Sequence, residues 1–389
     1  MTLVPNSLVK DRWIRTLSDM ACGEIEFVGP DGDTIKQKGK LPGPSARFQI
    51  HDWAVLQRAM ARGDIGLGED YIAGGWDTDD VEALIAYFLL NFENLEGYAN
   101  GNLLNRLLFV LMNTMVRRNS LSGSKRNIES HYDVGNDFYS LWLDETMTYS
   151  SALYGPGPGT LADAQRNKYG RILSRLEKTP GEILEIGCGW GGFAEEAAKV
   201  DRRVTGLTIS PSQYAYATNR LADRAEIRLE DYRKVGGRFD SIVSIEMFEA
   251  VGERYWPQYF NVLGERLKSG GRAVIQTILI RDELFSAYRR RSDFIRHYVF
   301  PGGMLPSFAR FKDEAAGAGL KVVDTYSFGQ HYARTLRDWS SRMRERETEI
   351  LALGRDPKFL RNWQFYLGMC AAAFAVGRTD VAQIELQRA

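Results

Sequence analysis

The residues best placed for ligand chemistry are the glycines Gly187, Gly189, Gly191 and Gly192. They follow an apolar run at 181–186 and stand at the start of a helical pattern at 192–200. Glycine permits positive φ and lets a ligand approach backbone N–H groups at the beginning of a helix. The spacing therefore predicts a glycine-rich turn that binds a cofactor, although dinucleotide enzymes and plain tight turns use similar glycines.

Acidic residues indicate which cofactor such a turn would hold. A dinucleotide site needs an acid about 20 residues further on, whereas the second predicted strand here ends at 207–210 without one. Glu185 instead precedes the first glycine, and Glu230 and Asp231 follow the next unit. These carboxylates fit a ligand with an ammonium group, a ribose and an adenine, which are the parts of S-adenosylmethionine. A bare turn with solvated acids is the alternative.

Strands and helices alternate around this turn. The patterns predict strands at 181–186, 203–208, 239–245 and 272–277 and helices at 192–200 and 212–222. This alternation is typical of βαβ units and a parallel sheet, with ligands at the carboxyl ends of the strands. Short mixed segments precede it and end in a helical pattern near 81–92. We therefore expect a small domain at 1–100, a helix and linker at 101–127 and a larger domain at 128–389.

Composition limits the partners and the compartment. Lys plus Arg and Asp plus Glu both number 50, so no general basic field would gather nucleic acid. Cys22, Cys188 and Cys370 lack paired spacing, which argues against a disulfide framework or a zinc site and for a reducing, cytoplasmic compartment. The N-terminus does not resemble a signal peptide. The apolar run at 103–116 is too short and polar to span a bilayer, and it is either a buried helix or a surface-lying one.

Several motifs closely resemble the cyclopropane-fatty-acid synthase family, which includes the mycolic acid cyclopropane synthases. The motifs occur at 131–139, 148–152, 187–192, 206–210, 247–249, 300–303 and 305–307 and at Tyr332, Thr335 and Leu336. Upstream, Gly63, Asp64, Gly68, Glu69, Tyr71 and Trp76 resemble the N-terminal domain of the branch that acts on phospholipids. The resemblance implies an α/β, Rossmann-like class I methyltransferase domain with a smaller N-terminal α+β domain.

The activity implied by this resemblance is transfer of a methylene or methyl group from S-adenosylmethionine to the cis double bond of an unsaturated acyl chain. The acyl chain would belong to a membrane phospholipid, and the product would be a cyclopropane fatty acid. The resemblance further implies a homodimer that is cytoplasmic and peripherally associated with the membrane.

The resemblance also implies roles for individual residues. Cofactor contacts are implied for Tyr149, Ser150, Gly187, Gly189, Thr208, Gln213, Glu230 and Asp231. The family uses a bound bicarbonate ion as its base, and by motif match Glu249, Ile278 and Tyr332 would help to hold it. Three positions depart from the family pattern. Ser151 replaces a Cys, and Gln276 and Ala250 each replace a His. Ser151 keeps a backbone N–H and Gln276 an amide donor, so both remain catalytic candidates.

The departures leave the product open. Methyl transfer to an alkene leaves a carbocation, which must be kept from water in a dry pocket. The base then decides between a ring and a methylene- or methyl-branched unsaturated chain. Candidates for the walls of the pocket are Tyr132, Phe138, Tyr139, Tyr149 and Phe248, with an ordinary core role as the alternative.

A basic segment at 281–291 offers a route to the substrate. It interleaves arginines with Leu284, Phe285 and Tyr288, and arginine clusters pair with phosphate while apolar groups enter the acyl region. Docking on anionic phospholipid is the hypothesis, and a solvated charged face with core aromatics is the alternative. A methyltransferase for a soluble substrate and a non-catalytic lipid- or cofactor-binding protein also remain open.

Overall fold

The structure is a computed structural model that describes residues 5–99, 134–176 and 181–388. It divides into two compact units. Residues of Met1–Arg117, Arg290–Val299 and Arg344–Gly377 make the small unit, and the other described residues make the large unit. Among the described helices, none is long and apolar enough to cross a membrane. The predicted helix and linker at 101–127 lie outside the described residues, so the domain boundaries stay a prediction.

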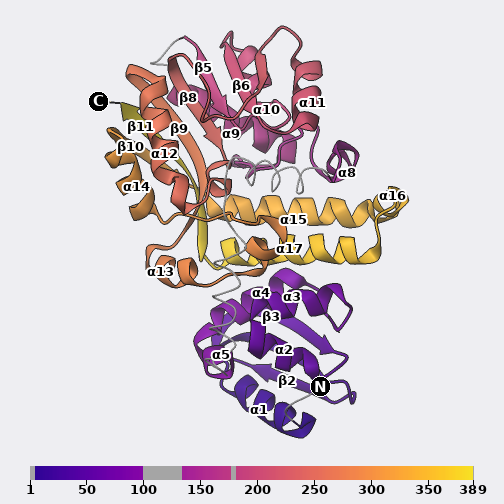
Figure 1. Cartoon of the computed structure of the whole chain (residues 1–389). Coiled ribbons are helices and arrows are strands. Elements are labelled where there is room, and N and C mark those ends of the chain that lie inside the picture. Colours follow the sequence, from indigo (N-terminus) through magenta and orange to yellow (C-terminus); the bar gives the residue numbers. More distant parts are fainter. Residues whose placement is uncertain (1–4, 100–133, 177–180, 389) are drawn as a thin grey trace. The chain divides into compact units, whose positions relative to one another are not determined.

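The small unit combines one sheet with helices. Its strands are β1 (Cys22–Val28), β2 (Thr34–Lys38), β3 (Leu41–Ile50) and β4 (Trp76–Asp77), in the order β2-β1-β3-β4. Its helices are α1 (Asn6–Ser18), α2 (Ala54–Arg62), α3 (Asp64–Ile72), α4 (Val81–Leu90), α5 (Phe92–Ala99), the π-helix η3 (Ile295–Val299), α16 (Glu347–Ala352) and α17 (Pro357–Ala375). Helix α17 packs on α3 and α4 (Figure 1). Two segments from late in the sequence thus complete this unit.

The large unit is built on a seven-stranded sheet with the order β10-β11-β9-β8-β5-β6-β7. The strands are β5 (Ile183–Ile186), β6 (Val204–Thr208), β7 (Glu226–Leu229), β8 (Phe239–Ile245), β9 (Leu267–Ile280), β10 (Leu320–Ser327) and β11 (Thr379–Arg388). The helices are α8 (Asn136–Trp142), α9 (Leu161–Arg175), α10 (Gly192–Ala198), α11 (Pro211–Leu221), η1 (Phe248–Ala250), η2 (Glu253–Tyr255), α12 (Trp256–Arg266), α13 (Asp282–Arg290), α14 (Phe308–Gly317) and α15 (Gly329–Glu345).

Most of the predicted elements of the large unit are confirmed. Strands β5, β6, β8 and β9 and helices α10 and α11 occupy the predicted places, and β9, β8, β5, β6 and β7 run parallel. The expectation of a parallel sheet fails at one edge, because β11 is antiparallel to both β9 and β10. Strand β11 was not predicted, because Gln383 and Glu385 interrupt its apolar pattern although both are buried.

Helices cover both faces of this sheet, as a buried parallel sheet requires. On one face, side chains of α9, α10 and α11 pack with Ile183, Val243 and Val274. On the other face, α12 and α14 pack with Leu184 and Ile186 among others. The alternation along β5 between the two faces follows from the twofold repeat of a strand. Because it is packed on both faces, the sheet holds the loops at the ends of its strands in fixed positions.

Strand β5 is the point in the sheet at which the order of the strands reverses. Strand β6 lies beside β5 on one side, and β8 lies beside it on the other. In open α/β sheets such a switch point leaves a crevice outside the carboxyl ends of the two diverging strands. The glycine-rich turn follows β5, and the segment from Glu246 to Glu249 follows β8. Both therefore stand at the place where a ligand is expected.

Candidate active site

The glycine-rich turn leaves β5 with positive φ at Gly187, Gly189 and Gly191. A Cβ at Gly187 would lie 2.8 Å from Cγ of Met247, and one at Gly191 would lie 2.8 Å from Cδ1 of Leu221. At Gly189, no described atom would lie within 4 Å of a Cβ. Packing therefore requires the glycines at 187 and 191, whereas Gly189 borders open space that a ligand can enter.

Glu185 is the acid of this turn. The residue is buried at 2% exposure, and its Oε2 atom has no hydrogen-bond partner among the described residues. Burial raises the pKa of Glu185 well above its usual value, and the positive charge of Lys168 opposes that shift. A buried polar atom without a partner is costly and calls for a ligand donor. An ammonium group of S-adenosylmethionine would supply one, so the turn fits this cofactor.

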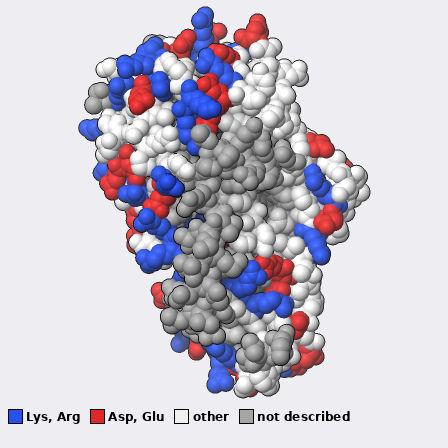
Figure 2. Space-filling view, in the orientation of Figure 1, with Lys and Arg blue, Asp and Glu red and all other residues white. Residues whose placement is uncertain are grey.

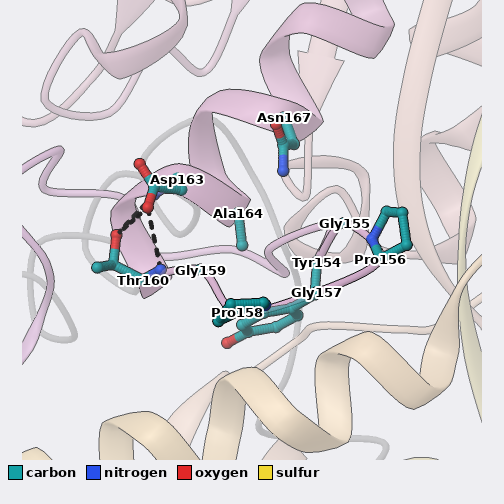
Figure 3. Close-up of a pocket in the computed structure, with 10 residues that line it drawn as sticks. All are labelled: Tyr154, Gly155, Pro156, Gly157, Pro158, Gly159, Thr160, Asp163, Ala164 and Asn167. Carbon is teal, nitrogen blue, oxygen red and sulfur yellow. Dashed lines mark hydrogen bonds between the residues drawn. The ribbon is translucent and has the colours of Figure 1, made fainter.

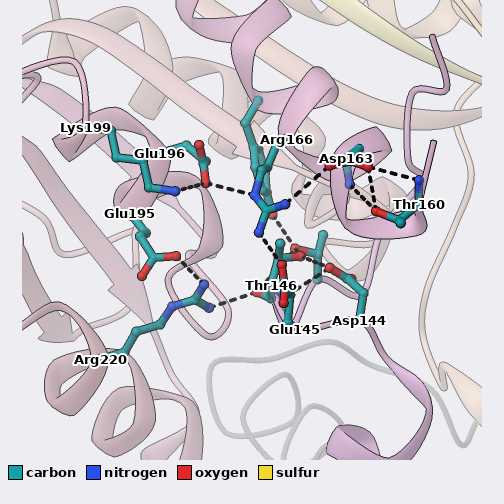
Figure 4. Close-up of polar contacts among 12 residues, drawn as sticks. Asp144, Glu145, Thr146, Thr160, Asp163, Arg166, Glu195, Glu196, Lys199 and Arg220 are labelled. Atoms are coloured by element: carbon teal, nitrogen blue, oxygen red, sulfur yellow. Dashed lines mark hydrogen bonds and ion pairs between the residues drawn. The ribbon is translucent and has the colours of Figure 1, made fainter.

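The segment that carries Tyr149 and Ser150 is held on α10 and α11 by a polar network (Figure 4). Arg220 of α11 donates to the carbonyl oxygen of Thr146 at 2.8 Å and pairs with Glu195 of α10 at 2.6 Å. The Thr146 hydroxyl contacts Asp144 at 2.6 Å, also inside the network. Arg166 of α9 joins Glu145 and Glu196 to the same group. These contacts fix the approach of residues 149–151 to the edge of the sheet.

Ser150 and Tyr149 have different surroundings. The Lys168 ammonium donates to the Ser150 hydroxyl at 2.6 Å, and the Gln165 amide donates to the Ser150 carbonyl oxygen at 2.9 Å. The ring of Tyr149 lies 5.2 Å from that of Trp339, between centroids, and 5.5 Å from that of Tyr139. Ser150 is thus fixed by α9, and Tyr149 belongs to an aromatic cluster.

The ribose and adenine candidates occupy the ends of β6 and β7. The Thr208 hydroxyl donates to Gln213 at 2.9 Å, and the Glu230 N–H donates to the Thr208 carbonyl oxygen at 3.0 Å. Asp231 instead pairs with Arg233 through both carboxylate oxygens. The structure therefore brings Thr208, Gln213 and Glu230 together, while the Asp231 carboxylate is already engaged. Their cofactor roles stay predictions.

A second acidic group stands after β8, where Glu246 adopts a left-handed backbone with φ of 50°. Its Oε1 accepts the Ser151 N–H at 2.8 Å and the Gln276 amide at 2.7 Å, and its Oε2 accepts the Tyr332 hydroxyl at 2.6 Å. Glu246 is half-buried, whereas Ser151, Gln276 and Tyr332 are buried. Desolvation raises the pKa of Glu246, and Lys168 and these three donors oppose the shift.

The orientation of Gln276 depends on the unpredicted strand β11. Gln276 of β9 lies opposite Gln383 in the ladder, and Gln383 donates its amide to the Gln276 oxygen at 3.0 Å. The Gln276 nitrogen is therefore turned toward Glu246. These two linked amides fix a hydrogen-bond donor at the position where the family pattern has a histidine.

Glu249, on the 3₁₀ turn η1, is the third acid. Its Oε1 accepts the Thr277 hydroxyl at 2.9 Å and the backbone N–H of Ile278, while its Oε2 has no partner among the described residues. Desolvation, with repulsion from Glu246, raises the pKa of Glu249 to about 8. Glu249 and Ile278, which the resemblance assigns to one bicarbonate ion, thus contact each other directly, and the Glu249 carboxyl group holds a proton at neutral pH.

Sequence reasoning missed Glu246 and Lys168. Glu246 directly follows a predicted strand and lies at a carboxyl end, which is a usable signal. Lys168 stands inside the helical pattern of α9, where an exposed position is the ordinary expectation, and yet it is fully buried. Its burial lowers its pKa. Nothing in the local sequence predicts that.

The aromatic candidates divide between a cluster and the core. Phe138, Tyr139 and Tyr149 lie in one aromatic cluster with Trp142. Phe248 is fully buried beside Trp256, and it matches the alternative of an ordinary core residue. Tyr132 lies outside the described residues.

A small hollow lies beside the loop that connects Ser151 to α9. It is lined by Tyr154–Gly159 of the loop and by Ala164 and Asn167 of α9 (Figure 3). Thr160 and Asp163 form a capping box that begins α9. The Tyr154 hydroxyl donates to Asp338 at 2.6 Å, which ties the loop to α15. The hollow therefore lies beside the beginning of α9, the helix that carries Lys168.

The donors implied for a bicarbonate ion are already engaged. Ser151, Gln276 and Tyr332 all donate to Glu246, and the Ile278 N–H donates to Glu249. A further anion would have to displace one of these two carboxyl groups from its donors. The residues present therefore do not fit a bound bicarbonate.

Comparisons with known proteins identify the family. The family model for mycolic acid cyclopropane synthetase matches residues 119–384. The cyclopropane-fatty-acyl-phospholipid synthase of Escherichia coli is 33% identical over 98% of this chain and 95% of its own length. The tuberculostearic acid methyltransferase UfaA1 of Mycobacterium tuberculosis is 38% identical over 87% of this chain and 82% of its own length.

A solved structure supports the same assignment. The mycolic acid cyclopropane synthase CmaA1, in a complex with SAH and CTAB, is similar with a TM-score of 0.64 and 30% identity. The likeness covers 68% of this chain and 98% of that one. The resemblance carried by the sequence motifs is thus confirmed, and with it the α/β methyltransferase fold. The chain belongs to the mycolic acid cyclopropane synthetase family.

Proposed function

We propose that this protein transfers a one-carbon group from S-adenosylmethionine to the cis double bond of an unsaturated acyl chain in a phospholipid, forming a cyclopropane. The observation that carries the proposal is the placement of two sites at neighbouring strand ends. A cofactor turn follows β5 beside Glu185, whose Oε2 atom has no partner among the described residues, and a carboxylate with three donors follows β8. The Escherichia coli relative, named for this activity, matches nearly the whole chain.

When bound, S-adenosylmethionine supplies an electrophilic methyl group on sulfur. In this proposal Glu185 balances the ammonium charge of the cofactor, and the turn at Gly187 and Gly189 admits its polar part. Tyr149 and Ser150 hold it from the other side. Orientation of the alkene against the methyl group can lower the barrier by about 7–11 kcal/mol. The buried surroundings of Ser151 and Gln276 exclude water from the reacting carbon.

A methyl- or methylene-branched product is the second candidate. It is supported by the UfaA1 relative, which is named a tuberculostearic acid methyltransferase, and by a Pseudomonas putida relative named a probable fatty acid methyltransferase. A methyl-branched alkene forms when a chain carbon, instead of the new methyl group, loses the proton, and a methylene branch forms when a hydride shift precedes proton loss from the methyl group. Gln276 replaces a histidine of the family in this very cluster, so the position of the base can differ.

The membrane-docking hypothesis needs a correction. Phe285 stacks on Trp256 with centroids 6.3 Å apart, and the Leu305 N–H donates to the Tyr288 hydroxyl at 3.3 Å. These aromatic rings pack against the core of the large unit rather than extend toward lipid, as the alternative interpretation predicted. Arg289 pairs with Glu253 at 2.7 Å. On the described surface in Figure 2, basic and acidic side chains are intermingled.

The remaining part of that hypothesis concerns charge alone. Arg289, Arg290 and Arg291 would contact anionic headgroups when the protein associates peripherally with the cytoplasmic face of a membrane. We expect vesicle binding in sedimentation assays to weaken when all three are replaced by Ser. Unchanged binding would remove this segment from the proposal.

A homodimer also belongs to the proposal, and the sedimentation velocity of the protein tests it.

The proposed activity is tested with the whole chain. The protein is incubated with S-adenosylmethionine and vesicles of dioleoyl phosphatidylglycerol, and the released acyl chains are analysed by mass spectrometry and proton NMR. A gain of one CH₂ with cyclopropyl protons supports ring formation. The same gain with alkene protons retained selects the methylated or methylene product. No gain, while S-adenosylmethionine still binds, rejects both candidates for this substrate.

A further inference from the structure

Glu246 occupies the centre of the donor cluster after β8. Three groups from three different parts of the large unit converge on its carboxylate. They are the Ser151 N–H, the Gln276 amide of β9 and the Tyr332 hydroxyl of α15. The family resemblance assigns Tyr332 to the bicarbonate ion and leaves Ser151 and Gln276, which depart from the family pattern, as catalytic candidates. The anion that they surround here is a side chain of the protein itself.

We propose that the Glu246 carboxylate is the general base of this enzyme, in place of an ion recruited from solution. The inference rests on the proposed function, because it assigns the proton-accepting step of that reaction. Sequence motifs assigned the acidic role to Glu249, three residues further on. Glu246 and Glu249 therefore have to be told apart by their surroundings.

The two carboxyl groups differ in their hydrogen bonds. Glu246 accepts hydrogen bonds on both oxygens, and these bonds, with the nearby charge of Lys168, oppose the rise in the pKa of Glu246 that burial causes. Glu249 accepts on one oxygen only, and its other oxygen is buried without a described partner. When neighbouring acids have environments that separate their pKa values, one acts as the base and the other keeps its proton. Because donors reach both of its oxygens, Glu246 is assigned the role of the base, and Glu249 that of the acid that keeps its proton.

The backbone at Glu246 supports a functional position. A φ of 50° is unfavourable for a non-glycine residue, and such strain concentrates at active sites where the surroundings enforce it. The Glu246 N–H donates to the Gln276 carbonyl oxygen at 2.8 Å, which locks the main chain in this form. A glycine would adopt the same backbone without strain. Replacement of Glu246 by Gly is thus compatible with the fold and removes the carboxylate.

The step balances as follows for ring formation. The methyl carbon bonds to one alkene carbon with the π electrons, S-adenosylhomocysteine leaves with the electron pair of the sulfur–carbon bond, and the other alkene carbon becomes cationic. Glu246 takes a proton from the methyl carbon, and the electron pair of that C–H bond closes the ring. The proton remains on Glu246 and passes to water after the product has left. For a methylene product, a hydride first moves from the methylated carbon to the cationic carbon. Glu246 then takes a proton from the same methyl carbon, and the electron pair of that C–H bond forms the double bond of the methylene branch.

The experiment compares the wild-type protein with Glu246→Gln and Glu246→Gly. Turnover is measured with S-adenosylmethionine and dioleoyl phosphatidylglycerol vesicles in buffer stripped of carbon dioxide, with and without added bicarbonate. We expect wild-type turnover to be the same within a factor of two in both buffers. Glu246→Gln should lose about 10²- to 10⁴-fold in either buffer, because an amide of the same shape cannot accept the proton. Glu265→Gln, an exposed change on α12, is the matched control and should behave as wild type.

A binding measurement adds a readout that does not depend on turnover. ¹³C NMR of labelled bicarbonate should show line broadening with Glu246→Gly, which removes the carboxylate that accepts from three donors. Wild type and the Glu265→Gln control should show no such broadening. Added bicarbonate should also restore part of the turnover of Glu246→Gly. Circular dichroism and S-adenosylmethionine affinity confirm that each variant is folded.

Two results would overturn the inference. One is a wild-type enzyme that loses turnover without bicarbonate and binds the labelled ion. The other is a folded Glu246→Gln enzyme with wild-type turnover. A wild-type protein that transfers no carbon in either buffer would reject the proposed function instead, and the NMR contrast between wild type and Glu246→Gly would still judge whether the carboxylate fills the ion site.

Discussion

Glu185 and Glu246 stand at the same edge of the sheet, on neighbouring strands, and their partners differ. Glu185 is buried with one oxygen that has no described partner, next to a turn that borders open space. Glu246 is half-buried and has donors on both oxygens. The first region is incomplete until a ligand arrives, whereas the second is complete within the chain. Unsatisfied polar atoms thus mark the place where binding occurs, and satisfied ones mark a preorganised group.

Glu185→Gln tests the incomplete region. Among the changes at Glu185, Tyr332 and Glu249, it should have the largest effect on binding or turnover. We expect its dissociation constant for S-adenosylmethionine to rise roughly 10- to 100-fold, the cost of a hydrogen bond to a charged group. Burial raises the pKa of Glu185 in the free protein, and an ammonium partner lowers it, so wild type should release a proton on binding. Calorimetry in buffers of different ionisation enthalpy measures both quantities.

Glu182→Gln is the control for this change, because Glu182 is exposed just before β5. It should keep the wild-type affinity and the proton release. Equal affinity of Glu185→Gln and wild type would show that the unpaired oxygen does not face the cofactor, and the contrast between the two regions would then disappear.

Tyr332→Phe removes one donor from the complete region. We expect kcat to fall roughly tenfold, which is less than the about 10²- to 10⁴-fold that a general base contributes as a whole. Donation by the Tyr332 hydroxyl lowers the pKa of Glu246, so its loss raises that pKa, while Lys168 and Glu249 remain in place. A base must be unprotonated, so the acidic limb of the kcat profile should move to higher pH.

The measurement is kcat against pH for both proteins, with Tyr326→Phe as control. Tyr326 is an exposed tyrosine of β10. A profile for Tyr332→Phe that is lowered equally at every pH would indicate a merely structural role for Tyr332.

Glu249→Gln should give the smallest effect, seen in stability. The pKa of Glu249 is raised from 4.5 to about 8 in the folded protein, so the folded state holds this proton more tightly than the unfolded chain. Its contribution to stability is complete below pH 4.5 and is lost as pH rises through about 8. The Tm of Glu249→Gln relative to wild type should therefore increase by several degrees across this window. Parallel Tm curves for wild type and Glu249→Gln would contradict the raised pKa, and Glu265→Gln should stay parallel to wild type.

Prediction from sequence succeeded where the cause is local. The turn at Gly187 and the strands β5, β6 and β8 follow from glycine spacing and short apolar runs, so they were found in place. Lys168 has the appearance of a surface residue, because only the fold encloses it. The same holds for Glu246, whose donors come from residues 95 positions before it, 30 after it and 86 after it. Contacts between residues so far apart in the sequence produce no periodic pattern from which they could be predicted.

Strand β11 has a consequence for the synthesis of the protein. It lies between β9 and β10, and its Gln383 sets the amide of Gln276 that contacts Glu246. Chains fold during translation from their earlier segments onward. The sheet, and with it the orientation of Gln276, can be completed only after Thr379–Arg388 has left the ribosome. A nascent chain can therefore form the cofactor turn before its base is positioned.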